Sequence, residues 1–162
     1  MLMVTDGGSK RNEKGGEDMK QYYDEAVAFC SWAEQLASIS SENATEIILE
    51  IMKMYSLSSS LTLPEATEDQ ALEYEQVILP FTTTQSDGYW EIFDPFICDE
   101  PVCGSLRDDI CSIYNDIRKG NLFYEAGYPL DAQWEWKWSF ENHWKYHAVD
   151  AIRALNSLKD GE

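Results

Sequence analysis

The sequence has few of the residues that usually indicate a known chemistry. It contains two histidines and four cysteines in 162 residues. The cysteines, Cys30, Cys98, Cys103 and Cys111, are too few and too unevenly spaced for the disulfide framework of a small secreted domain. Cys98 and Cys103 lie at the loose edge of zinc-ligand spacing, but no second Cys or His pair follows at the distance of a zinc finger. We therefore expect reduced thiols and no metal site at the cysteines.

Basic residues are also scarce. Asp and Glu number 30 against 12 Lys and Arg, so the formal net charge is -18. Such a charge repels phosphate backbones and anionic membrane surfaces, and we expect neither direct nucleic-acid binding nor membrane association. The same field accelerates the encounter with a basic protein. An acidic surface is also ordinary in soluble proteins, so the charge restricts the partners without identifying one.

Long apolar runs are missing as well. No stretch approaches the length of a membrane span, because even Ile47–Tyr55 is interrupted by Glu50 and Lys53. Residues 1–18 lack the apolar core of a secretory signal and are rich in Gly, Lys and Glu. We expect this segment to be a flexible tail, residues 19–160 to form one helical domain, and the protein to be cytoplasmic.

Apolar residues recur at helical spacing along most of the remaining chain. The pattern predicts helices over 21–37, over 44–55 until the serines at 56–60, from a capping box at Thr67 to Pro80, from the N-cap Ser105 to Gly120, and over 132–158. The aromatic side chains of Tyr89, Trp90, Phe93 and Phe96 are expected to pack against the long helices. The predicted fold class is all-α, a single-domain irregular helical bundle of five to seven helices with a long C-terminal helix.

Both histidines lie in that last helix. At ~100° per residue, the sequence H-x-x-x-H-x-x-D places His143, His147 and Asp150 on one surface. Two imidazoles one turn apart can share a metal ion, and a carboxylate can complete the site or orient an imidazole. Asp109 and Asp116 lie on one flank of the preceding helix, so packing of the two helices would bring all five side chains together. These five residues form a candidate divalent-metal site.

The same five residues have two further interpretations. In the structural one, Asp109 satisfies the N-terminus of its helix, Asp116 is solvated, and the histidines donate hydrogen bonds to carboxylates within an aromatic core. In the other, a histidine beside an aspartate acts as a general acid or base without metal. The sequence identifies no substrate-binding group that would favour this last interpretation.

A second candidate surface lies on the same helix. Lys137, Glu141 and Lys145 form a row at i, i+4 spacing between the apolar face and the side chains of Trp134 and Trp138. Aromatic residues beside charges are typical anchors of protein interfaces. We therefore take Trp134, Trp138 and Glu141 as candidate partner-binding residues, while core packing remains the competing interpretation of the tryptophans.

The second half of the chain also carries a recognisable set of motifs. They are Tyr89-Trp90-Glu91, Asp94-Pro95-Phe96, Gly104-Ser105-Leu106, Ile113-Tyr114-Asn115-Asp116, Trp134-Glu135-Trp136-Lys137, His143-Trp144 and Arg153-Ala154-Leu155. Over Tyr89 to Leu155, and less closely from Tyr22 onward, the chain resembles the bacterial all-helical family catalogued as domain of unknown function 5063. The resemblance implies a single helical domain and supplies no catalytic residues.

These observations favour a non-enzymatic function. The main hypothesis is an acidic, helical protein-binding module whose partner is a basic protein, such as a bacterial nuclease toxin that it neutralises as an immunity protein does. No cofactor is expected under this hypothesis. The alternative is a metal-dependent helical hydrolase that uses the His143, His147 and Asp150 face and needs a divalent metal.

Overall fold

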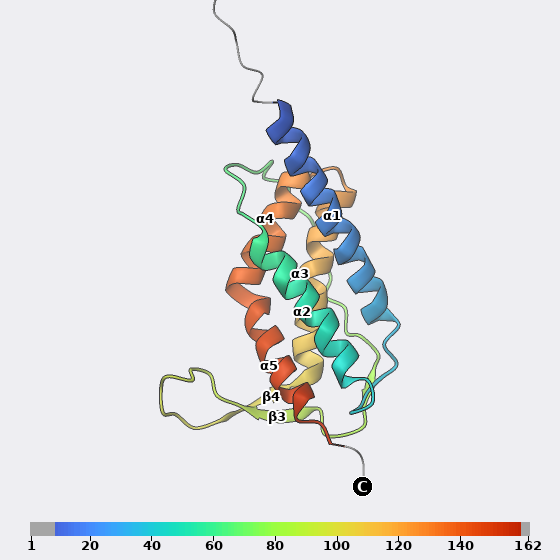
Figure 1. Cartoon of the computed structure of the whole chain (residues 1–162), viewed down its shortest axis with the longest axis vertical. Coiled ribbons are helices and arrows are strands. Elements are labelled where there is room, and N and C mark those ends of the chain that lie inside the picture. The colour runs from blue at the N-terminus through green and yellow to red at the C-terminus, as the bar shows by residue number, and fades with distance from the viewer. Residues whose placement is uncertain (1–8, 160–162) are drawn as a thin grey trace, which may run out of the picture.

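The helices of residues 9–159 form four rods that run side by side along the long axis of the molecule (Figure 1). The computed structural model describes residues 9–159, and their side chains from residue 14 onward. The rods are α1 (Ser9–Glu34), α2 (Ala44–Ser60), α3 (Leu106–Glu125) and a C-terminal rod made of α4 (Pro129–Ser139), the π-helical turn η1 (Phe140–Trp144) and α5 (Lys145–Asn156). The fold is predominantly helical, as predicted. The prediction of five to seven helices is wrong, because the segment expected to form the third helix is extended and residues 9–159 form four rods.

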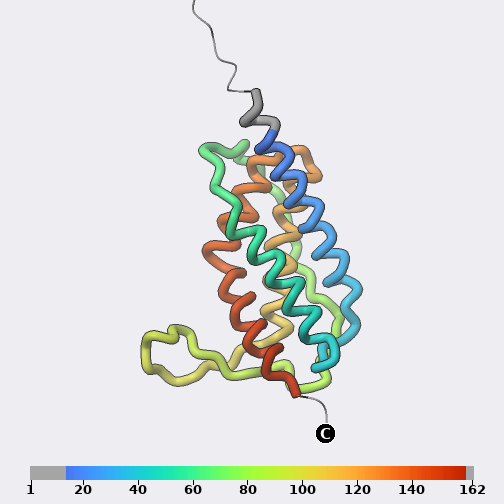
Figure 2. Tube along the Cα trace, viewed as in Figure 1, coloured from blue at the N-terminus to red at the C-terminus, as the bar shows by residue number. Residues whose placement is uncertain are grey.

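The segment from residue 61 to 81, where a third helix was expected, runs back along the bundle without helical turns (Figure 2). Side chains of neighbouring helices take over the hydrogen bonds that a helix would have made. The buried carboxylate of Asp131 accepts two backbone N–H groups near the start of the segment, and Asn115 exchanges hydrogen bonds with the backbone of Val77. Tertiary partners therefore outweigh the local capping signal at Thr67.

A β-hairpin stands where the aromatic patch was expected to pack on the bundle. Strands β3 (Gly88–Glu91) and β4 (Val102–Ser105) pair antiparallel, and the loop between them, residues 92–101, projects sideways from one end of the bundle (Figure 1). Alternation along β3 turns Tyr89 towards the core and Trp90 outward. Trp90, Phe93 and Phe96 are 72%, 94% and 98% exposed, so the packing prediction is wrong for these three. We call residues 92–101 the hairpin loop.

Two short strands, β1 (Ser38–Ile39) and β2 (Thr82–Thr83), pair in parallel and tie the α1–α2 connection to the chain before the hairpin. Strands are thus a minor component of the described region. Helix α1 begins at Ser9, so residues 9–18 of the expected flexible tail are helical, and residues 1–8 lie outside the described part.

The predicted N-cap of α3 is confirmed, whereas its predicted C-terminal end is wrong. The hydroxyl of Ser105 accepts the backbone N–H of Asp108 at 3.1 Å, which confirms the predicted N-cap. Gly120, predicted to end the helix, lies inside it. A Cβ there would be 2.1 Å from the indole of Trp136, so this glycine permits close packing of α3 and α4. The turn after α3 instead uses Gly127, at φ +88°.

The core lies between the rods. Trp136, Phe140 and Trp144 of the C-terminal rod are fully or almost fully buried. Trp136 packs on Tyr22 of α1 and Phe140 on Tyr55 of α2, while Trp144 packs on Phe140. The predicted apolar face of the last helix is therefore confirmed as a core face. Among residues 9–159, no helix has both the length and the apolar character needed to cross a bilayer.

Candidate functional site

A cleft of about 860 Å³ lies where the hairpin meets the start of α3 and the C-terminal rod. Its acidic and histidine lining residues are Glu91, Asp94, Asp108, Asp109, His143, His147 and Asp150, and its aromatic ones include Phe93, Phe96 and Tyr146. We call it the hairpin cleft. It brings together four of the five predicted metal-site residues, and only Asp116 does not line it.

His147 and Asp109 form the inner pair of the cleft. Nδ1 of His147 lies 2.8 Å from Oδ1 of Asp109, and the phenol of Tyr89 donates to Oδ2 of the same carboxylate at 2.5 Å. Asp109 is 3% exposed. A buried carboxylate is tolerated only when its oxygens are hydrogen-bonded, so β3 and α5 together hold this residue of α3.

His143 and Asp116 form an outer pair. Nδ1 of His143 lies 2.6 Å from Oδ2 of Asp116, and the ring centroids of the two histidines are 4.8 Å apart. Asp116 lines a neighbouring cavity that also reaches His143. Because each imidazole is engaged at Nδ1, each retains Nε2 for a proton, a metal ion or a ligand.

The inner pair has perturbed acidities. Burial raises the pKa of Asp109 above its ordinary value, although the hydrogen bonds from His147 and Tyr89 act in the opposite direction. The hydrogen bond to Asp109 raises the pKa of His147 against the effect of burial. The pKa of Asp150 is raised by burial, and next by the negative charges of Glu91 and Asp109. Such shifts in a cleft are a common property of functional sites.

The C-terminal rod changes its winding beside this cleft. The predicted helix over 132–158 is interrupted by η1, a turn of π-helix that contains His143 and ends at Trp144. Phe140 and Trp144 pack edge to face in the core at 4.9 Å, while His143 on the same turn reaches the flank of α3. Turns of this type are rare and often lie at functional sites.

The predicted partner-binding tryptophans form a stacked pair on the surface of α4. The rings of Trp134 and Trp138 lie 5.4 Å apart at an interplanar angle of 12°, and the two residues are 37% and 44% exposed. They line cavities next to the segment that precedes the hairpin, not the hairpin cleft. The pair is thus partly exposed, and its role in binding remains a prediction.

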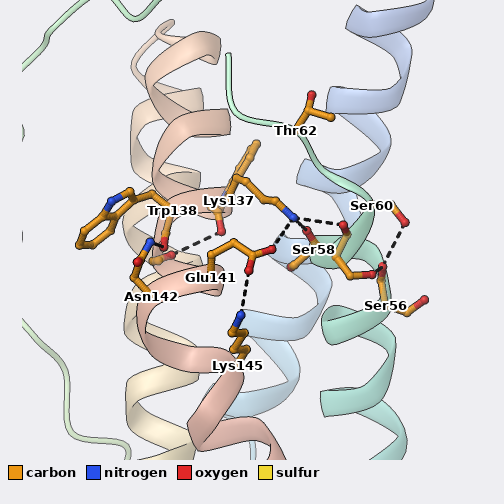
Figure 3. Close-up of polar contacts among 12 residues, drawn as sticks. Ser56, Ser58, Ser60, Thr62, Lys137, Trp138, Glu141, Asn142 and Lys145 are labelled. Atoms are coloured by element: carbon orange, nitrogen blue, oxygen red, sulfur yellow. Dashed lines mark hydrogen bonds and ion pairs between the residues drawn. The ribbon is translucent and has the colours of Figure 1, made fainter. Parts of the chain in front are cut away.

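Glu141 is engaged by the two lysines of its own row (Figure 3). Its carboxylate lies 2.8 Å from Nζ of both Lys137 and Lys145, and these contacts lower the pKa of Glu141 to about 2. Lys137 also donates to the carbonyls of Ser58 and Ser59 at the end of α2. The row therefore joins the C-terminal rod to α2, and Glu141 presents a largely neutralised charge to any partner.

The sequence interpretation missed the contribution of the hairpin. Tyr89 and Glu91 enter the site from β3, and Asp108 joins it beside Asp109. Nothing in the local sequence pattern indicates that the chain returns at Val102–Ser105 to pair with Gly88–Glu91.

Comparison of structures shows a fold shared with a solved protein. The chain is similar to the crystal structure of protein BF1032 from Bacteroides fragilis, with a TM-score of 0.66 and 18% sequence identity over 86% of this chain and 93% of that chain. At this identity the likeness concerns the fold. No curated protein matches the chain.

The family comparison covers almost the whole described region. The model of the family described as Domain of unknown function (DUF5063) matches residues 15–160, which include the bundle, the hairpin and both His–Asp pairs. The chain therefore belongs to the DUF5063 family.

Proposed function

We propose that the protein is an acidic protein-binding module for a basic protein partner, and that the hairpin loop is its contact surface. One observation carries the proposal: Phe93 and Phe96 are 94% and 98% exposed on a loop that also bears Asp94, Asp99 and Glu100. Apolar side chains so exposed are unfavourable in water unless a ligand or partner covers them.

The composition of the loop supports a basic partner. Its aromatic rings supply short-range anchors of the type that dominates binding energy at protein interfaces. Its carboxylates, together with the formal net charge of -18, attract cationic surfaces over a longer range and disfavour anionic ones. Ile92 and Ile97 add exposed apolar area to the same loop. The surface thus combines steering by charge with anchoring by aromatic residues.

A toxin with a cationic active-site face is the partner class that we propose. The protein would neutralise it as an immunity protein does, by covering that face, and this function needs no chemical step. The location that we propose is the cytoplasm, where such toxins act on nucleic acid.

The experiment compares two surfaces of the same protein. Immobilised wild-type protein, a Phe93→Ser/Phe96→Ser variant and a Trp134→Gln/Trp138→Gln variant are exposed to lysate of the native host at low and high salt. The proposal expects a basic protein that the wild type retains at low salt and that the hairpin variant does not retain. The captured protein is then produced separately, and its dissociation constants for the three forms are measured.

Equal binding of that protein by the hairpin variant and the wild type would contradict the assignment of the surface. Loss of binding only in the Trp134/Trp138 variant would move the interface to α4. Binding that does not weaken with salt would remove the electrostatic part of the proposal.

A further inference from the structure

We propose that the hairpin cleft binds one divalent transition-metal ion through Asp108, Asp109 and His147. The proposal does not depend on the protein-binding function, because the three ligands belong to α3 and α5 and none belongs to the hairpin loop.

The geometry of three side chains points to this site. One ligand-type atom from each of Asp108, Asp109 and His147 lies within 4.8 Å of the other two. Ligand atoms on one zinc ion lie up to about 4.2 Å apart, since each is about 2.1 Å from the metal. Small rotations of the side chains are therefore sufficient to bring all three onto one ion. Asp108 is exposed and free to make such a rotation.

The inner pair already places two of the three ligand atoms close together. Nδ1 of His147 and Oδ1 of Asp109 lie 2.8 Å apart, so an ion about 2.1 Å from both atoms would take the place of the proton that they share. The hydrogen bond from the phenol of Tyr89 to Oδ2 of Asp109 would remain. Ligands already oriented by such hydrogen bonds lose less conformational freedom when a metal binds.

The surroundings favour a cation in this cleft. Glu91, Asp94 and Asp150 line it together with the three ligands, and within the described part of the chain no Lys or Arg is among its lining residues. A concave site lined by one sign of charge concentrates counter-ions. Two carboxylates with one imidazole select an ion such as Zn²⁺, Co²⁺ or Mn²⁺, whereas Ca²⁺ and Mg²⁺ prefer oxygen ligands only.

The number of ligands also indicates the class of site. Three protein ligands leave coordination positions for water, which is the arrangement of catalytic rather than structural zinc sites. The nearby ring of His143, 4.8 Å from that of His147, lies within the same cleft. A site of this kind is suited to metal-assisted hydrolysis of a small uncharged ester.

The test is a titration of the full chain with zinc. Protein freed of metal by dialysis against a chelator is titrated with Zn²⁺ by calorimetry near pH 7.5, and its melting temperature is measured with and without the metal. The proposal expects one equivalent of Zn²⁺ per chain and a higher melting temperature. It also expects at least tenfold weaker binding in Asp108→Asn and in His147→Gln.

Glu100→Gln is the matched control, because it removes one negative charge from the hairpin loop outside the cleft lining. It should bind Zn²⁺ as the wild type does. Absence of one-equivalent binding in the wild type overturns the site, and so does unchanged affinity in Asp108→Asn. Asp108 is exposed, so this variant decides the question even where His147→Gln unfolds the protein. A negative result leaves the capture experiment with Phe93→Ser/Phe96→Ser unaffected.

Discussion

Nδ1 of His147 lies 2.8 Å from Oδ1 of Asp109, so a residue near the end of the chain satisfies a buried carboxylate in the first turn of α3. This contact joins two helices that are distant in the sequence. It also links the stability of the fold to the protonation of one imidazole, because the hydrogen bond to Asp109 raises the pKa of His147.

The first prediction concerns this pH dependence. A group whose pKa is higher in the folded than in the unfolded protein contributes stability that is complete below the unfolded pKa, about 6.5 for histidine. This contribution is lost as the pH rises through the folded pKa. The free energy of unfolding should therefore decrease as the pH rises above about 6.5.

Urea unfolding of the wild type and His147→Gln across this range checks the prediction. The variant should lack the part of the decrease that His147 contributes. Because the pKa of Asp109 is also raised, its titration decreases the free energy of unfolding in the same way, but at lower pH. The contributions of the two residues are therefore distinguished by the pH range in which each is lost. Identical pH profiles for the two proteins would show that the His147–Asp109 contact does not couple protonation to folding.

The second prediction concerns Gly120 in α3. Alanine normally stabilises a helix relative to glycine, but a Cβ at this position would be 2.1 Å from the indole of fully buried Trp136. Gly120→Ala should therefore decrease the free energy of unfolding by about 1–3 kcal/mol, the usual cost of overpacking. Gly16→Ala in α1 is the control, since a Cβ there would meet nothing within 4 Å and the change should stabilise by up to about 1 kcal/mol.

The third prediction concerns the four thiols. Cys98 and Cys103 are exposed, whereas Cys30 and Cys111 are buried. Burial raises the pKa of Cys30 to about 12 and also raises that of Cys111. A thiol reagent should therefore label two cysteines in the native protein and all four in denaturant. The labelled cysteines are identified by peptide mass. Rapid labelling of Cys30 in the native protein would contradict its buried position in the core.

The fourth prediction concerns Lys137. Its ammonium group donates to the last carbonyls of α2, and its side chain is 13% exposed. The side chain of Lys145 pairs with Glu141, lies over the ring of Tyr146 and is 27% exposed. Lys137→Met should decrease the free energy of unfolding by about 1 kcal/mol through loss of the cap. Lys145→Met should change it by less, because exposed ion pairs contribute little. Equal effects in thermal or urea unfolding would argue against the capping role.

Helical periodicity in the sequence was a good guide where a helix has one apolar face. The predicted helices at 44–55 and from Ser105 are present, and the second has a buried stripe of Leu106, Ile110, Ile113 and Ile117. The local signals were misleading where a tertiary partner changes the outcome. Gly120 has the appearance of a helix end, yet it lies within α3 because Trp136 needs the space of its missing side chain.

The candidate site was predictable in part. Helical projection correctly placed His143, His147 and Asp150 on one surface, and the flank of α3 supplied the two aspartates. The contribution of Tyr89 was not predictable, because it depends on a hairpin closed by residues more than ten positions away. The exposure of Phe93 and Phe96 was missed for the same reason, since aromatic residues are more often buried than exposed.

The dissociation constant of the captured basic protein, measured for the wild type and for Phe93→Ser/Phe96→Ser, tests the proposed function most directly. Both side chains are almost fully exposed, so the variant should fold with a free energy of unfolding within about 0.5 kcal/mol of the wild type. We predict that the variant binds at least about tenfold more weakly, as expected for loss of aromatic anchors. Equal dissociation constants for the two proteins would contradict the proposal that the hairpin loop is the contact surface.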